Sequence, residues 1–191
     1  LYKRHGIRRY GFHGTSHLFV SERMAEITGK PLAEQKVITC HLGNGCSIAA
    51  IKEGKSMDTS MGFTPLEGLL MGTRSGDLDP AVVLHIMNKE ELTMHEANTM
   101  LNKHSGIQGL SGISSDMREI EEEYESNNRA RLTHDLFCYR IKKYIGSYAA
   151  VMGGLDAIVF TGGIGENSEI VRENVLNDLN FLGINLNKQK N

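Results

Sequence analysis

The sequence lacks tryptophan altogether and carries little net charge. Aromatic residues make up only 6% of the 191 residues, and the formal net charge is -2. A balance this close to neutral lacks the basic excess with which nucleic-acid and anionic-membrane binders neutralise phosphates, so we expect neither partner. No apolar run approaches the roughly 18 residues of a membrane span, and the first residues lack the apolar core of a signal peptide.

Cysteine and proline are scarce too, with three of each. The cysteines, Cys40, Cys46 and Cys138, are odd in number and lie in apolar or helical surroundings. This pattern favours a reducing cytoplasm over a disulfide framework. A zinc site at Cys40, His41 and Cys46 is only weakly indicated, because no second cysteine pair accompanies them.

Hydrophobic residues at 40% and charged residues at 23% favour a folded chain over a disordered one. The length predicts essentially one domain over residues 1–191. The first residue is Leu1 and the last stretch, residues 185–191, is polar. We therefore expect this chain to be a piece of a longer protein.

Glycine is the residue in excess, with 21 against only three prolines, and its share exceeds the usual level of about 7%. Four glycines lie in residues 59–79, a stretch with little hydrophobic periodicity. A loop this long inside a domain is typical of a functional segment. The chain therefore needs, at several positions, backbone conformations or close approaches that a Cβ atom would prevent.

Residues 36–42 and 46–51 are β-rich apolar runs separated only by Gly43-Asn44-Gly45, which predicts a tight hairpin. A short strand at 56–58 completes a three-strand meander, and residues 156–160 predict a buried fourth strand. Periodicity and capping residues predict helices over residues 15–28, 91–104, 129–152 and 168–179. Two more helices are expected to begin at residue 80 and at a capping box within residues 114–119. In the helix over residues 15–28, Thr15 or Ser16 would cap, and the apolar face would comprise Phe19, Val20, Met24 and Ile27.

Two glycine-rich turns could bind an anion. His41-Leu42-Gly43-Asn44-Gly45 joins two strands, and Thr161-Gly162-Gly163-Ile164-Gly165-Glu166-Asn167 leads from a strand to a helix. Glycines let backbone N–H groups approach a phosphate, and a helix N-terminus adds a positive dipole end. A plain hairpin and a plain strand-to-helix turn remain alternatives.

Arg74 lies between glycines within residues 71–77, where its fork could hold a phosphoryl group. The alternative is a surface ion pair with Asp77 or Asp79. His13 and His17 have the i, i+4 spacing of metal ligands, but no Glu or Cys lies nearby and metal ligation is disfavoured. Asp116 can be explained structurally as a helix cap. The acidic run 119–125 can be explained as the solvent-exposed face of a helix.

Four segments, in this order, are similar to motifs of the acetate kinase family. They are Tyr-Gly-Phe-His-Gly-Thr-Ser-His at residues 10–17, His-Leu-Gly-Asn-Gly at 41–45, Met-Gly-Thr-Arg-Ser-Gly-Asp at 71–77 and Phe-Thr-Gly-Gly-Ile-Gly-Glu-Asn at 160–167. The resemblance spans nearly the whole chain. It implies an α/β fold, the actin-like ATPase (ribonuclease H-like) lobe with a mixed five-stranded sheet flanked by helices, and it implies the C-terminal, nucleotide-binding lobe of a two-lobe kinase.

The resemblance also implies the reaction: ATP and acetate give ADP and acetyl phosphate, reversibly and with Mg²⁺, in a cytoplasmic homodimer. His13 and Arg74 would stabilise the transferring phosphoryl group. Nucleotide contacts would come from three segments: His41, Leu42, Gly43, Asn44 and Gly45 at the phosphates; Asp116, Met117 and Arg118 at the ribose and adenine; and Gly163, Ile164, Gly165, Glu166 and Asn167 at the α-phosphate and adenosine.

The resemblance leaves one expectation about the isolated chain and two functional alternatives. Other family parts, including a catalytic Asp and most of the acyl pocket, have no counterpart here, so this chain alone is expected at most to bind nucleotide weakly. A propionate or other short-chain acyl kinase is the nearest alternative to an acetate kinase. A non-catalytic nucleotide-binding module is the alternative from another class, although simple binding would not need His13 and Arg74.

Overall fold

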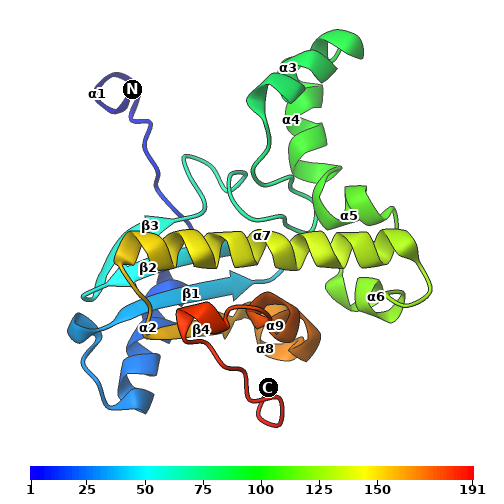
Figure 1. The fold of residues 1–191 in the computed structure, drawn as a ribbon. Coiled ribbons are helices and arrows are strands. Elements are labelled where there is room, and N and C mark those ends of the chain that lie inside the picture. The colour runs from blue at the N-terminus through cyan, green and yellow to red at the C-terminus, as the bar shows by residue number, and fades with distance from the viewer.

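A four-stranded mixed sheet forms the centre of the fold (Figure 1). The computed structural model describes all residues, 1–191. The strands are β1 (Lys36–Leu42), β2 (Cys46–Lys52), β3 (Lys55–Thr59) and β4 (Ala157–Thr161), in the order β3-β2-β1-β4. The first three form the predicted antiparallel meander, and β4 lies parallel to β1. The α/β class with a mixed sheet is thus confirmed.

The expectation of five strands is wrong for these residues, because the sheet has four. Only four runs of the sequence combine an extended backbone with a β-rich composition. After β4 the chain enters a helix at once, and the last 15 residues, rich in Asn and Lys, form no strand. β4 is therefore an edge strand, paired only with β1.

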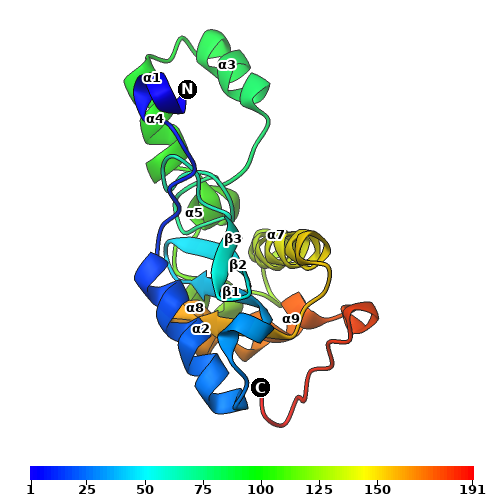
Figure 2. The ribbon, with the colours of Figure 1, turned by 90° about the vertical axis from the view of Figure 1, so that its left-hand side faces the viewer.

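Helices cover both faces of the sheet (Figure 2). The helix α7 (Asn128–Met152) lies on the face that carries Ile38, Leu42 and Ile48, the main apolar core, while α2 (Gly14–Thr28) lies on the other. Side chains alternate between the faces of a strand, so Thr39 of β1 faces α2. The face under α2 carries the polar side chains of Thr39, His41 and Ser47, together with a small apolar cluster of Met24, Val37 and Ile51.

These polar side chains explain why the predicted orientation of α2 is only partly right: of the four residues expected on its inward face, Met24 alone is buried. Phe19 and Ile27 are 65% and 72% exposed, whereas the buried residues of α2 are His17, Ser21 and Met24. His17 turns inward because the buried hydroxyl groups of Thr39 and Ser47 on the strands need hydrogen-bond partners. The apolar periodicity alone could not reveal this requirement.

The start of α2 also differs from the prediction. The residue at the N-cap position is His13, in the left-handed conformation at φ 58°, and neither Thr15 nor Ser16 caps the helix. A non-glycine residue with positive φ is uncommon and draws attention to a functional position. Here it places the His13 ring against the sheet.

The prediction of one long helix over residues 129–152 is confirmed, since α7 spans Asn128–Met152. Its first turn is capped by the Asn127 side chain, which accepts from the backbone N–H groups of Arg129 and Ala130. Gly153 ends the helix in the left-handed conformation at φ 68°, where glycine carries no Cβ penalty. Ile141 and Ile145 of its apolar face are fully buried.

We expect Asn127→Ala to lower the free energy of unfolding by about 1 kcal/mol, because two N–H groups of the first turn lose their acceptor. Urea denaturation followed by circular dichroism measures the shift. Asn128→Ala, at the exposed neighbouring position, is the matched control and should change stability by less than about 0.5 kcal/mol. Equal effects of the two substitutions would contradict the capping role.

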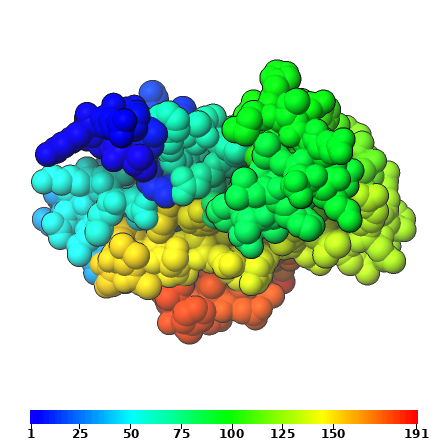
Figure 3. Space-filling model, turned by 90° about the horizontal axis from the view of Figure 1, so that it is seen from above, coloured from blue at the N-terminus to red at the C-terminus, as the bar shows by residue number.

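The remaining helices connect these layers. They are α1 (Tyr2–His5), α3 (Pro80–Lys89), α4 (Met94–Lys103), α5 (Gly106–Ser111), α6 (Met117–Glu122), α8 (Gly162–Asn167) and α9 (Glu169–Leu176), with short 3₁₀ turns at Leu32–Glu34 and Asn180–Leu182. As predicted, Asp79 caps α3 and Pro80 begins it. The helices α3 and α4 extend away from the sheet (Figure 1). Seen from above, the green residues of this region form one side of the upper surface, apart from the dark blue N-terminus (Figure 3). None of the helices combines the length and apolar character needed to span a bilayer.

Three local expectations need correction. Residues 162–167, expected as a turn, form the helix α8, and the helix expected over 168–179 is α9, capped by Ser168 and ending at Leu176. The capping box expected within residues 114–119 is not formed in full. Asp116 caps α6, but Glu119 accepts a hydrogen bond from Ser114 instead of reaching back to the N-cap backbone.

The long glycine-rich loop is confirmed, with no helix or strand between β3 and α3. It is nevertheless anchored, because Met61, Leu69 and Met71 are fully buried in the core. The buried side chain of Met71 at one end, and the Asp77 N–H at the other, which donates to the Gly68 carbonyl oxygen at 2.9 Å, hold residues 71–77 in place.

Candidate functional site

The candidate site lies at the edge of the sheet where the parallel strands β1 and β4 end. His41 pairs with Thr161 there, and the chain continues into the hairpin turn on one strand and into α8 on the other. At Gly162, φ is 79° and a Cβ atom would lie 2.6 Å from the carbonyl oxygen of Leu42, so only glycine fits. Ligands of open α/β sheets bind outside the carboxyl ends of parallel strands.

The loop carrying Arg74 is fastened to the hairpin turn. The Gly72 N–H donates to the carbonyl oxygen of Asn44 at 2.9 Å, and a Cβ on Gly72 would lie 1.7 Å from Asn44 Oδ1. A Cβ on Gly45 would lie 2.7 Å from Nη2 of Arg74. The two segments approach each other through bare backbone, which brings the guanidinium group beside the turn.

The guanidinium group of Arg74 has no carboxylate partner, so the ion pair considered above is not formed. Its Nη1 donates to the carbonyl oxygen of Pro65 at 2.6 Å. Asp77 instead accepts from Tyr144 Oη at 2.6 Å and from the Gly68 N–H, and Asp79 caps α3. A half-buried, unneutralised fork beside a glycine turn is suited to bind an oxyanion.

His13 lies next to Arg74. Its ring stacks on His41 with centroids 4.1 Å apart, its Nδ1 lies 2.8 Å from Ser47 Oγ, and its Nε2 lies 3.6 Å from where a Cβ of Gly45 would be. Burial, and then the neighbouring His41 and Arg74, lower the pKa of His13 to about 4. The ring is therefore neutral at pH 7 and can act through a hydrogen bond without a charge of its own.

His17 lies behind His13 and is buried. Its two ring nitrogens lie 2.7 Å from Thr39 Oγ1 and 2.7 Å from Ser47 Oγ. Burial, followed by His41 and His13, lowers the pKa of His17 to about 4. Both nitrogens are engaged by hydroxyl groups, so this histidine pair is a hydrogen-bonded cluster.

The three cysteines are free and buried. Burial raises the pKa of Cys40 and Cys138, and it raises that of Cys46 to about 12. The thiols are therefore protonated at pH 7, which makes them poor nucleophiles.

A cavity of about 700 Å³ opens beside the hairpin turn. It is lined by three segments that are far apart in the sequence, at residues 43–44, 115–121 and 163–168. Eight of the predicted nucleotide contacts line it: Gly43, Asn44, Asp116, Met117, Arg118, Gly163, Ile164 and Asn167. Its size fits a cofactor or nucleotide.

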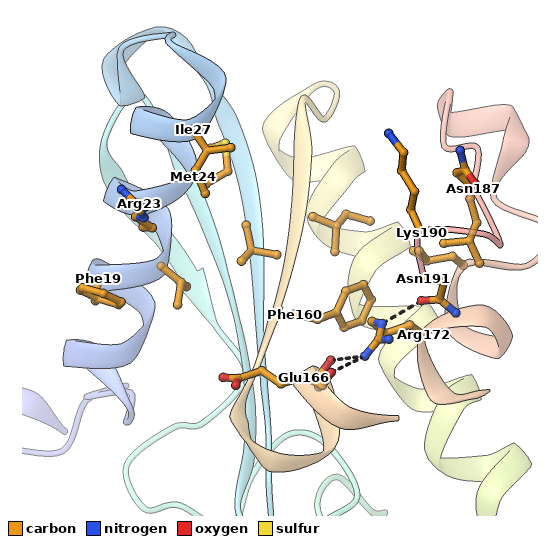
Figure 4. A pocket seen from close by; sticks show the side chains of 16 residues that line it. Phe19, Arg23, Met24, Ile27, Phe160, Glu166, Arg172, Asn187, Lys190 and Asn191 are labelled. Carbon is orange, nitrogen blue, oxygen red and sulfur yellow. Dashed lines mark hydrogen bonds between the residues drawn. The ribbon is translucent and has the colours of Figure 1, made fainter. Parts of the chain in front are cut away.

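Five predicted contacts do not line this cavity. His41 and Gly45 lie on the His13 and Arg74 side of the turn, and the Leu42 side chain is fully buried in the core. Gly165 and Glu166 line a different cavity of about 650 Å³ between α2 and β4. There Arg172 donates to the carbonyl oxygens of Gly165 and Glu166 and to the Asn191 side chain (Figure 4).

The structure adds three lining residues that the sequence did not indicate, Ser115, Glu121 and Ser168. Glu121 accepts a hydrogen bond from Ser168 Oγ at 2.5 Å, and its side chain is only 18% exposed. It was expected on a solvated helix face. The available signal was its position four residues after Met117, which places both on one side of α6.

Asp116 is confirmed as a helix cap, since its carboxylate accepts the Arg118 N–H at 3.0 Å. It also pairs with the Arg118 guanidinium at 2.5 Å, and these hydrogen bonds hold the pKa of Asp116 below its usual value. Its contact with a ribose stays a prediction.

Comparison with known proteins gives one consistent result. The model of the acetokinase family matches residues 1–191. Acetate kinases of Caldicellulosiruptor saccharolyticus and Thermotoga petrophila are 59% and 62% identical over 192 residues, which is 100% of this chain and 48% of each relative. The crystal structure of Porphyromonas gingivalis acetate kinase aligns with TM-score 0.97 at 53% identity, covering 99% of this chain and 48% of that one. A propionate kinase from Francisella tularensis aligns with TM-score 0.93 at 46% identity, covering 100% and 49%.

The chain thus spans about half the length of the curated relatives it matches. Its correspondence to their C-terminal lobe stays a prediction.

Proposed function

The chain belongs to the acetokinase family, and on that premise we propose that the whole protein transfers a phosphoryl group from ATP to acetate, giving ADP and acetyl phosphate, and catalyses the reverse reaction. The observation that carries this proposal is the unneutralised Arg74 fork held against the Gly45 turn, beside a nucleotide-sized cavity. Phosphoryl transfer needs mainly positioning and positive charge at the transferring group.

Arg74 and His13 are the proposed catalytic residues. The carboxylate of acetate attacks the γ-phosphorus, an O–P bond forms to the acetate oxygen, and the bond to the β-phosphate oxygen breaks. The fork of Arg74 binds two equatorial oxygens as their charge grows. The neutral ring of His13, held beside the fork, donates a hydrogen bond to a third.

The nucleotide is proposed to lie in the cavity. The Gly43 N–H closes the turn by donating to the Gly45 carbonyl oxygen, so the Asn44 N–H beside it would hold a phosphate while Gly43 leaves room for the ligand. The start of α6 at Asp116, Met117 and Arg118 would contact the ribose and adenine. Gly163, Ile164 and Asn167 would lie along the α-phosphate and adenosine. His41, Gly45 and Leu42 serve the hairpin itself in this proposal, and Gly165 and Glu166, which face the other cavity, have no contact role.

Magnesium belongs to the proposed reaction as the partner of ATP, where it neutralises phosphate charge. The chain holds no group of three or more His, Cys, Asp or Glu side chains placed to bind a metal ion. These residues therefore do not fit a protein-bound metal site. The ion would arrive on the phosphates, as Mg²⁺ does when it keeps several waters.

The proposed setting is a cytoplasmic homodimer that acts without nucleic acid or membrane. Three buried, free thiols support a reducing compartment, and the net charge of -2 supports the absence of polyanionic partners. Support for the dimer comes from α3, which buries none of its residues although Leu84 is apolar and 69% exposed.

Propionate is the second candidate substrate, supported by the close structural match to a propionate kinase. Acetate is preferred because the curated relatives near 60% identity are acetate kinases. A binding module without catalysis is less well supported, since it gives no reason for the free fork of Arg74.

We expect the 191-residue chain to bind a fluorescent ADP analogue saturably but weakly, and to form no acetyl phosphate by itself. The analogue supplies the signal because the chain has no tryptophan. Gly163→Leu should abolish binding, since a side chain there meets no protein atom within 4 Å and extends into the cavity.

The matched control is Gly146→Leu on α7, another glycine with no atom within 4 Å of a built Cβ, which lies outside the cavity. It should bind like the unchanged chain. Binding that survives Gly163→Leu would move the nucleotide elsewhere, and acetyl phosphate made by the chain alone would contradict the expectation that it needs the rest of the protein.

A further inference from the structure

Four side chains form a continuous hydrogen-bonded row that ends at the proposed reaction site. Thr39 Oγ1 lies 2.7 Å from His17 Nδ1, His17 Nε2 lies 2.7 Å from Ser47 Oγ, and Ser47 Oγ lies 2.8 Å from His13 Nδ1. We call this row the hydroxyl–imidazole relay (Thr39, His17, Ser47 and His13). The last free atom of the relay is His13 Nε2, which lies on the side of Gly45 and Arg74.

The fold dictates this row from two elements. Thr39 and His41 lie two residues apart on β1 and so share a face, and Ser47 of β2 is paired directly with His41. On α2, His13 and His17 are one turn apart and face the sheet together. Thr39 and Ser47 are fully buried, and His17 is 6% exposed. Solvent therefore cannot replace any link behind His13.

The buried hydroxyl of Thr39 fixes the direction of the hydrogen bonds. The Thr39 O–H has one acceptor within reach, the Nδ1 of His17. If it donates there, a neutral His17 carries its proton on Nε2 and donates to Ser47 Oγ. Ser47 must then donate its own proton to His13 Nδ1, because a hydroxyl has only one. In this direction every donor behind His13 is satisfied, and the only free donor is the Nε2–H of His13 at the end of the row.

The opposite direction leaves a buried donor without an acceptor. His17 Nδ1–H would donate to Thr39, and the Thr39 proton would then have no partner in a fully buried position. An unsatisfied buried donor disfavours this arrangement by about tenfold or more. It would also leave a lone pair on His13 Nε2, which repels a phosphoryl oxygen.

We propose that the relay holds His13 in the tautomer that carries its proton on Nε2, so that Thr39, His17 and Ser47 are positioning residues for a hydrogen-bond donor aimed at the transferring phosphoryl group. The use of this donor rests on the proposed function, whereas the tautomer itself does not. None of the three positioning residues touches the reacting atoms.

The surroundings keep both rings neutral, which the relay requires. His13 is faced by His41 of β1 and by Arg74 of the loop, and His17 is faced by His41 and His13. All of these groups oppose a positive charge on either ring. Glu166 acts on His41 in the other direction, but it is not among the groups that influence His13 or His17. A neutral ring has one donor nitrogen and one acceptor nitrogen.

The tautomers can be measured directly on this chain. Histidine-selective ¹⁵N labelling and two-bond ¹H–¹⁵N correlation spectra at pH 7 report which ring nitrogen carries the proton. We expect Nε2–H for His13 and His17, with ratios of about tenfold or more. Thr39→Val, which removes the first donor at nearly constant shape, and Ser47→Ala, which cuts the row, should each lower the His13 ratio at least about threefold.

Two controls separate the relay from a general disturbance. Thr39→Ser keeps the donor and should restore the unchanged spectrum. Ser16→Ala removes the hydroxyl group 2.9 Å from His41 Nδ1, outside the relay, and should leave the His13 tautomer unaltered. The relay is overturned if His13 of the unchanged chain carries its proton on Nδ1, or if the ratio persists in folded Thr39→Val and Ser47→Ala chains.

Activity of the whole protein gives a second readout. Thr39→Val should lower kcat about tenfold with little change in the KM for ATP, and Thr39→Ser should recover it. If the substitutions change the His13 tautomer as expected but the whole protein transfers no phosphoryl group, the relay is supported and the proposed function is overturned. If the whole protein is an active kinase but Thr39→Val and Ser47→Ala leave the His13 tautomer unchanged, only the relay is overturned.

Discussion

Replacing Arg74 with alanine in the whole protein is expected to lower kcat by about 10³–10⁵-fold, the range for an arginine that stabilises phosphoryl transfer. The KM for ATP should change only a few-fold. Arg74 lies at the hairpin turn and does not line the nucleotide cavity, so its interaction strengthens as charge develops on the transferring group. An acyl phosphate assay with hydroxylamine gives kcat, and equilibrium binding of a fluorescent ADP analogue gives affinity.

Two further variants sharpen this test. Arg74→Lys keeps the charge but loses the planar fork, so it should recover only part of the lost rate. Arg23→Ala, on the exposed side of α2 and paired there with Glu26, should leave kcat unchanged. A loss of nucleotide affinity in Arg74→Ala without a matching loss of kcat would favour a binding module over an enzyme.

Features set by short-range pattern were predictable from the sequence. The hairpin at Gly43–Gly45 follows from two β-rich runs separated by three turn residues, and α7 follows from helical periodicity that ends at Gly153. Asp79 followed by Pro80 marks a helix start, because the Asp79 carboxylate caps the first turn and the ring of Pro80 fits the first helical position. Each of these signals lies within a few residues of the structure that it specifies.

The remaining features depend on contacts between distant segments. The inward position of His17 on α2 is set by Thr39 and Ser47 on the strands, so the apolar pattern of the helix indicated Met24 alone among its buried residues. Glu121 looks like part of a solvated acidic run until Ser168, 47 residues later, is placed against it. The expectation of a fifth strand came from the family resemblance and not from any β-rich run in these residues.

The assignment of motif residues to two separate cavities also could not be predicted from the sequence. Motif residues named together need not face the same space, as Glu166 and Asn167 illustrate. These neighbours belong to one short helix, α8, and successive residues of a helix point about 100° apart. Asn167 therefore lines the nucleotide-sized cavity while Glu166 lines the cavity beside α2.

Acidification from pH 7 to pH 5 is expected to lower the free energy of unfolding by about 2 kcal/mol through His17 alone. Burial, with His41 and His13 nearby, lowers the pKa of His17 from 6.5 to about 4 in the folded chain. Between pH 6.5 and about pH 4, the His17 ring is protonated in the unfolded chain and neutral in the folded chain. Stability is therefore complete above about pH 6.5, falls as the pH drops, and stops changing below about pH 4, where the folded ring is protonated too. Urea denaturation at pH 7, 6 and 5, followed by circular dichroism, measures this slope.

Substitution of the ring separates His17 from every carboxylate that titrates in the same range. His17→Gln retains a side chain able to hydrogen-bond Ser47, and it should reduce the slope between pH 6.5 and 4 by up to about 1.4 kcal/mol per pH unit. His13→Asn should reduce it less, because His13 is only half-buried, and asparagine tolerates the left-handed φ of 58° at that position. An unchanged slope in both variants would mean that neither ring is held neutral, and the relay would then lose the neutral imidazoles on which its direction depends.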